Sequence, residues 1–103
     1  MLKSPLLALA LLACQAAPVQ AAEPAQADKR IRLLAATCIS CHGQGGHSLG
    51  AVPSLAGQDK AYLQTAMMEC KTGARETTVM RRYMNGFTDE EITKLAEYFS
   101  NLK

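Results

Sequence analysis

Apolar residues recur at steps of three and four along three segments of the chain, a spacing that predicts three amphipathic helices. The first helix is expected to start near Asp28, because aspartate is favoured at an N-cap, with residues 22–27 as a loose leader. Gly43, Gly45 and Gly46 are expected to end it. Its apolar positions are Ile31, Leu34, Ala35 and Cys38.

The second predicted helix spans about residues 59–72, and Gly73 is suited to its C-terminal cap. The third has the clearest start, because Thr88 and Glu91 match a capping box. The apolar positions of these two helices are Tyr62, Leu63, Ala66, Met67 and Cys70, then Ile92, Leu95, Ala96, Phe99 and Leu102. Residues 74–87 show no clear period, and no segment alternates as a strand would. The predicted fold class is therefore all-α, with three main helices and long loops.

The first 21 residues have the pattern of a cleavable export signal. Lys3 gives a positive start, residues 6–13 form an apolar run too short to span a bilayer, and Ala21 suits the cleavage point. The mature domain is then residues 22–103, and the expected location is the periplasm. The alternative is a lipid attached at Cys14, because the residues leading to it loosely resemble a bacterial acylation site.

Charge and composition narrow the function further. Without Lys3, ten basic residues face nine acidic ones, a balance unlike that of nucleic-acid-binding domains. The mature chain has three cysteines, an odd number that argues against a disulfide framework, and no apolar stretch long enough to cross a membrane. A short chain with two Phe, three Tyr and no Trp is suited to folding around a large apolar cofactor.

The C-I-S-C-H sequence that ends the first predicted helix matches the attachment motif of c-type haem. The thiols of Cys38 and Cys41 are three residues apart, near one helical turn, so they can form thioethers with the two vinyl groups of one haem. The imidazole of His42 can then bind the iron. The motif predicts one covalently bound haem c.

The same residues are compatible with two other kinds of site. A dithiol redox site is expected beside a βαβ unit, and no strands are predicted. A zinc site would use Cys38, Cys41 and Cys70 with His42 or His47, but structural zinc sites bring their ligands as two close pairs and Cys70 stands alone. Haem is therefore favoured.

The second axial position of the iron has five candidates. A methionine there raises the reduction potential, a histidine lowers it, and an open position admits small ligands. Met67 and Met68 fall on the second helix, where core filling is more common, and His47 lies too close to the motif histidine. Met80 lies in the irregular segment and is favoured over Met84, which is closer to the last helix.

These features together resemble the small class I cytochromes c of bacteria. The likeness covers residues 30–102 and includes the haem motif, the P-S-L-A-G segment at residues 53–57, Met80 and the final amphipathic helix. It implies the class I cytochrome c fold wrapped around one haem. It also implies that the carbonyl of Pro53 accepts a hydrogen bond from His42, which fixes the orientation of the imidazole.

Residues 77–102 resemble, more narrowly, the cytochrome subunits of flavocytochrome c sulfide dehydrogenases. The matching residues are Thr78, Met80, Arg82, Gly86, Phe87, Thr88 and Tyr98. This resemblance implies that Met80 is the axial ligand, with Met84 as the fallback, and that the partner is a flavoprotein that oxidises sulfide. The pattern departs at Arg81, where a small residue is expected.

The expected function is periplasmic one-electron transfer as the haem subunit of such a complex, without a catalytic site of its own. The alternatives are a free carrier between a quinol-oxidising complex and a terminal oxidase or photosynthetic centre, and a haem protein with an open iron site. Arg75, Arg81 and Arg82 surround the expected ligand segment, where they would steer an acidic partner, pair with a haem propionate, or form a solvated face. Cys70 is expected to be a small buried hydrophobic residue.

Overall fold

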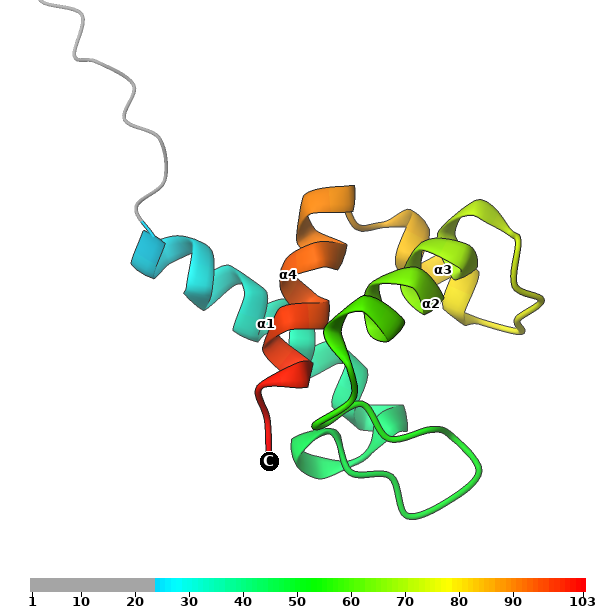
Figure 1. Ribbon diagram of the computed structural model, residues 1–103, viewed down its shortest axis with the longest axis horizontal. Helices are drawn as coiled ribbons and strands as arrows, with labels where there is room; N and C mark the ends of the chain where they lie inside the picture. Colours follow the sequence, from blue (N-terminus) through cyan, green and yellow to red (C-terminus); the bar gives the residue numbers. More distant parts are fainter. Residues whose placement is uncertain (1–23) are drawn as a thin grey trace, which may run out of the picture.

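A computed structural model describes residues 24–103 of the chain. The expected export signal and Cys14 lie outside the described residues. All-α architecture with three main helices is confirmed, and no strand occurs within residues 24–103 (Figure 1). In chain order the elements are α1 (Pro24–His42), the short 3-10 helix η1 (Gln44–Gly46), α2 (Lys60–Thr72), α3 (Met80–Asn85) and α4 (Asp89–Ser100).

Helix α1 starts earlier than the sequence predicted. The leader expected over residues 22–27 is helical from Pro24 onward, so Asp28 lies inside the helix and is not its N-cap. The physical reason is local. Proline suits the first helical position, where its missing N–H leaves no bond unmade, and the alanines and glutamine that follow are good helix formers.

The other predicted helix ends are confirmed. Asp59 caps α2 by accepting a hydrogen bond from the Tyr62 backbone N–H at 2.9 Å, and Gly73 ends it in the left-handed region with φ 85°. Thr88 and Glu91 form the predicted capping box at the start of α4. At these three helix ends, the capping residues thus satisfy backbone groups that would otherwise be unpaired.

Helix α3 was not predicted, because residues 74–87 carry no visible period. It has six residues, and Met84 is the only one of them that is fully buried, with 1% of its surface exposed. A helix this short is unstable on its own and depends on tertiary contacts. A single buried position also produces no periodic signal, which explains why the sequence pattern missed it.

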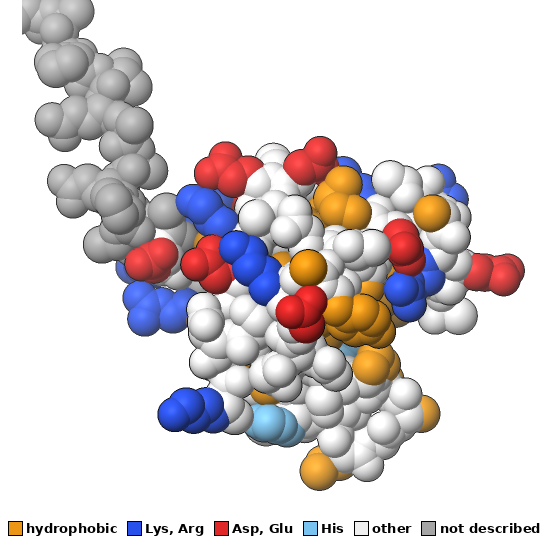
Figure 2. Space-filling view, viewed as in Figure 1, with side chains coloured by type: hydrophobic (Ala, Val, Ile, Leu, Met, Phe, Trp, Pro, Cys, Tyr) orange, Lys and Arg blue, Asp and Glu red, His pale blue; other side chains and the backbone are white. Residues whose placement is uncertain are grey.

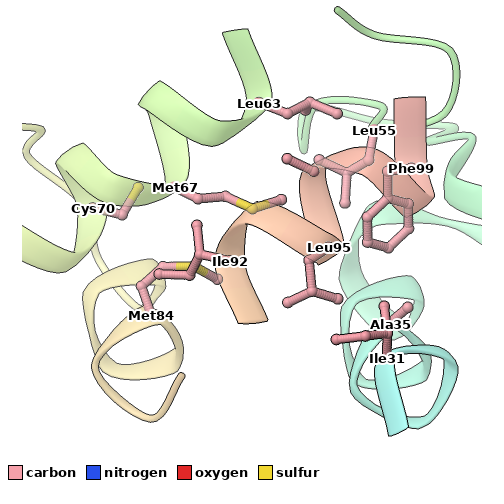
Figure 3. Close-up of a cluster of buried hydrophobic side chains, with 11 residues drawn as sticks. Ile31, Ala35, Leu55, Leu63, Met67, Cys70, Met84, Ile92, Leu95 and Phe99 are labelled. Carbon is pink, nitrogen blue, oxygen red and sulfur yellow. The ribbon is translucent and has the colours of Figure 1, made fainter. Parts of the chain in front are cut away.

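The core is centred on α4, which packs against both α1 and α2, while α3 packs against α2 (Figures 1 and 3). The four largest fully buried side chains are those of Phe99, Met84, Ile92 and Leu95. Cys70 belongs to this cluster with 6% of its surface exposed, as predicted. Tyr62 was wrongly placed on the buried face of α2: it is 55% exposed, because it projects from the flank of the stripe centred on Leu63.

Candidate haem site

The last turn of α1 presents two free thiols on one side of the helix. Cys38 is half-buried and Cys41 is exposed, and residues three apart on a helix are neighbours on its surface. Burial raises the pKa of the Cys38 thiol, with a hydrogen bond from Thr37 as a smaller opposing effect. The thiol therefore stays protonated at neutral pH, and its Sγ lies 3.8 Å from the Leu34 carbonyl oxygen.

The ring of His42 is buried and oriented by one hydrogen bond. His42 Nδ1 lies 2.6 Å from the carbonyl oxygen of Pro53, and 6% of the residue is exposed. A carbonyl oxygen can only accept, so the contact places a proton on Nδ1, and in the neutral ring the lone pair is then on Nε2. A neutral imidazole held in this tautomer is the form that binds a metal.

A tight loop carries Pro53 back to the end of α1. Gly43 turns the chain directly after His42 with φ 93°, and a side chain on Gly43 would collide with the backbone carbonyl of His47. The carbonyl of Gly46 then accepts hydrogen bonds from the N–H groups of Leu55 and Ala56 at 2.8 and 3.1 Å. These bonds fix the distance between the two halves of the loop.

The same loop is held against α4. An added Cβ on Gly46, which has φ 80°, would lie 3.1 Å from the Ala56 nitrogen and 3.3 Å from the Phe99 ring. The Gly57 N–H donates to the Phe99 carbonyl at 3.0 Å. Phe99 therefore links the core to the loop that places Pro53 beside His42.

The methionines divide clearly by burial. Met67 and Met84 are buried at 6% and 1% exposure, and both side chains lie in the core cluster of Figure 3. Met80 is half-buried at the first position of α3. His47 is exposed, and its Nε2 lies 2.9 Å from the Lys103 carbonyl oxygen. Met80 and Met68 are both half-buried and pack against the edge of the core, so burial leaves both thioethers available, and the role of Met80 as a ligand stays a prediction.

Lys71 was not singled out from the sequence, yet it helps to hold the segment that carries Met80. Its Nζ donates to the Phe87 carbonyl at 2.7 Å and forms an ion pair with Asp89 at 2.8 Å, which fixes the chain just after α3. These partners are 16 and 18 residues away in sequence. No local pattern signals contacts of that range.

The donor set fits a haem c better than a zinc ion. Within residues 24–103 there is no cluster of three or more His, Cys, Asp or Glu side chains that could hold a metal, and Cys70 lies in the core. Two thiols one helical turn apart beside an imidazole with a free Nε2 match the attachment groups of haem c.

Comparison with known proteins points the same way. Residues 25–99 match the family model described as "Cytochrome C oxidase, cbb3-type, subunit III". The chain is 43% identical over 75 residues to the cytochrome subunit of sulfide dehydrogenase from Chlorobaculum tepidum, over 73% of this chain and 68% of that protein. The chain belongs to the class I cytochrome c family.

Two further relatives carry different names within this family. Cytochrome c-554(548) of Halomonas halodenitrificans is 33% identical over 69 residues, covering 63% of this chain and 83% of the relative. Cytochrome c4 of Azotobacter vinelandii is 34% identical over 79 residues, covering 67% of this chain and 38% of the relative. This cytochrome is thus a c-type electron carrier, and membership of the family implies that it binds haem c.

The surface of this cytochrome mixes both signs of charge. On the face in Figure 2, basic and acidic side chains are interspersed, and hydrophobic side chains are exposed right of centre and at the lower edge. Arg75 is paired with Glu69 at 3.0 Å, whereas Arg81 and Arg82 are exposed. None of the helices within residues 24–103 is long and apolar enough to cross a membrane.

Proposed function

We propose that this cytochrome is a periplasmic one-electron carrier with a single haem c, bonded to Cys38 and Cys41 and ligated by His42 and Met80. The observation that carries the proposal is the 2.6 Å contact of His42 Nδ1 with the Pro53 carbonyl, directly beside two free thiols. We further propose that residues 1–21 are removed on export, so that the mature domain is residues 22–103. Mass measurement of the purified native protein should then place its first residue at Ala22.

The attachment step needs no oxidant. Cys38 and Cys41 would each hold the haem by a thioether: addition of a thiol to a vinyl group would form one carbon–sulfur bond, and the thiol proton would go to the other vinyl carbon. The half-buried Cys38 keeps the proton that this addition requires. Cys41, which is exposed, offers the second thiol one turn further along.

The side chains around the iron would hold it without chemistry of their own. A bound haem supplies an iron that takes up and releases one electron. His42 keeps its proton on Nδ1, bonded to Pro53, so the lone pair of Nε2 stays directed to a metal in either oxidation state. A thioether from Met80 is neutral in both states and raises the reduction potential. No side chain has to accept or release a proton.

The proposed partner is a flavoprotein that oxidises sulfide. The 43% identity to a sulfide dehydrogenase subunit, over most of both chains, supports this choice. Hydrosulfide would give up two electrons and a proton to leave sulfur, the flavin would take both electrons, and the cytochrome would accept them one at a time. A second, one-electron protein oxidant would then remove each electron from the cytochrome.

Exposed apolar residues beside the proposed ligand favour a lasting complex. Val79 directly precedes Met80 and is 50% exposed, and Tyr83, one turn from Val79, is 46% exposed. Residues four apart lie on one side of a helix, so these two exposed side chains lie on the same side of α3. Such a surface is typical of a subunit interface, whereas a free carrier presents a mainly polar face.

The experiment is size-exclusion chromatography of the native periplasmic protein at moderate salt, read at haem and flavin wavelengths. Co-elution of flavin and haem, with reduction of the haem when sulfide is added, supports the complex. Elution of the haem alone near the monomer mass, with no rapid response to sulfide, would favour the free carrier. A Tyr83→Ser variant tests the contact, because it should lose the flavin peak and retain its haem.

A further inference from the structure

Both ends of α3 are tied to the last turn of α2. After α3, the chain is held by Lys71 through the Phe87 carbonyl and Asp89. At the start of α3, the contact is made by a residue of α3 itself: the side chain of Arg81 extends from the first turn of α3 to Gly73. The six residues that begin with Met80 are therefore braced from α2 at both ends.

The guanidinium of Arg81 lies against the backbone of Gly73. A Cβ built on Gly73 would lie 3.1 Å from Arg81 Cζ, 3.1 Å from Nη1 and 3.4 Å from Nη2. Three guanidinium atoms at nearly equal distances mean that the flat face of the group covers the glycine. Gly73 is the left-handed cap of α2, where the helix dipole is negative, so a cation is favoured at this place.

Few hydrogen bonds fix the start of α3. Its N-cap residue, Val79, makes no side-chain hydrogen bond, and the Arg81 N–H donates instead to Thr77 Oγ1 at 3.1 Å. A six-residue helix does not persist without outside contacts. The contact of Arg81 with Gly73 is thus one side-chain link between α2 and the turn that carries Met80, beside the packing of Met80 against the core.

We propose that Arg81 is a positioning residue for Met80: its guanidinium, seated on Gly73, keeps the first turn of α3 where the thioether of Met80 meets the iron. This inference rests on the proposed function, because it takes Met80 as the axial ligand. It also accounts for the arginine found where the family resemblance leads one to expect a small residue.

The test is the affinity of the ferric holoprotein for imidazole, which competes with the axial thioether. The apparent affinity of such a competitor rises with the fraction of molecules in which the thioether has left the iron. Arg81→Ala should bind imidazole about tenfold more tightly than the unmodified protein, and its reduction potential should fall because the thioether bond is weakened. Arg82→Ala is the matched control: it removes the same charge one residue away and should bind imidazole like the unmodified protein.

Equal imidazole affinity in the Arg81→Ala and Arg82→Ala variants would overturn the proposal. Arg81→Lys keeps the charge without the flat group, so it should also bind imidazole more tightly, and it carries the test if the alanine variant does not fold. Met80→Ala separates the two claims. If Met80→Ala leaves imidazole affinity unchanged, the ligand assignment itself is wrong; if it raises the affinity and Arg81→Ala does not, only the role of Arg81 fails.

Discussion

Cys38, Cys41 and His42 lie within the last turn and a half of a long helix, whereas Met80 begins a separate six-residue helix that depends on its neighbours. The histidine is buried and hydrogen-bonded to the backbone of the adjoining loop. The methionine is half-buried, and its helix is braced by Lys71 and Arg81. The histidine side of the proposed site is thus encoded locally, and the methionine side is assembled by tertiary contacts. We therefore expect the bond from Met80 to the iron to be lost before the bond from His42 when the protein is perturbed.

The largest expected effect concerns the histidine side of the proposed site, which includes Cys38 and Cys41. Replacing both Cys38 and Cys41 with alanine should abolish covalent haem attachment, because no other described thiol lies beside His42. The measurement is the intact protein mass after extraction with acidified acetone. Cys70→Ala is the control and should keep the haem, because Cys70 belongs to the core cluster. Loss of the haem in the control alone would contradict the assignment.

A pair of variants tests which methionine binds the iron on the methionine side of the site. Met80→Ala should lose the long-wavelength absorption of the ferric iron–thioether bond. Met84→Ala should keep that absorption and lose about 2–5 kcal/mol of stability, because its side chain is fully buried in the core. Visible spectra and thermal unfolding of both holoproteins provide the measurement. A reversed pattern would make Met84 the ligand.

Two glycine variants test the loop that follows His42 and connects the histidine side of the site to the core. Gly46→Ala should lower stability by about 1–3 kcal/mol, because it forces an alanine into a positive φ and against Ala56 and Phe99. Gly50→Ala meets nothing within 4 Å and should change stability little. Denaturant unfolding of the two variants gives the comparison. Similar midpoints would mean that Gly46 does not hold the loop to α4.

The smallest expected effect is at the start of α4. Hydrogen bonds from Thr88 and the nearby Arg30 guanidinium, 2.9 Å away, lower the pKa of Glu91 below its usual 4.5, despite an opposing effect of burial. A carboxyl with a lowered pKa in the folded state stabilises the fold above its unfolded pKa, and this contribution is lost as the pH falls through the folded value.

Unfolding curves measured from pH 6 down to about pH 3 check this prediction, since the window follows from the glutamate pKa values. Glu91→Gln should lower stability at pH 6 by about 1 kcal/mol and should flatten the acid slope. Glu90→Gln removes a carboxylate from the same turn as a control and should keep the slope. An unchanged slope in Glu91→Gln would contradict the expected role of the capping box.

The same contrast explains what the sequence could predict. The haem motif, the cap at Gly73 and the capping box at Thr88 depend on residues close together in sequence, and the structure reproduces both caps. The brace of Arg81 on Gly73 and the bonds of Lys71 join separate elements, and no spacing along the chain marks them. Preference for Met80 over Met84 came partly from family resemblance, since periodicity failed across α3.

Start-of-helix errors have a related cause. Aspartate before the apolar stripe predicts an N-cap at Asp28, yet the helix already begins at Pro24, a residue favoured in the first turn. Tyr62 was assigned to the buried face by its spacing, although its position on the flank of α2 leaves it exposed. Pattern alone locates a helix and its central stripe better than its ends and edges.

The most direct test of the account is the proton NMR spectrum of the ferrous holoprotein, because a methionine methyl bound to iron lies over the haem ring and its signal is shifted far upfield. We predict one such methyl signal in the unmodified protein, lost in Met80→Leu and retained in Met84→Leu. Loss of the signal in Met84→Leu, or a spectrum without any upfield methionine methyl, would contradict ligation by His42 and Met80.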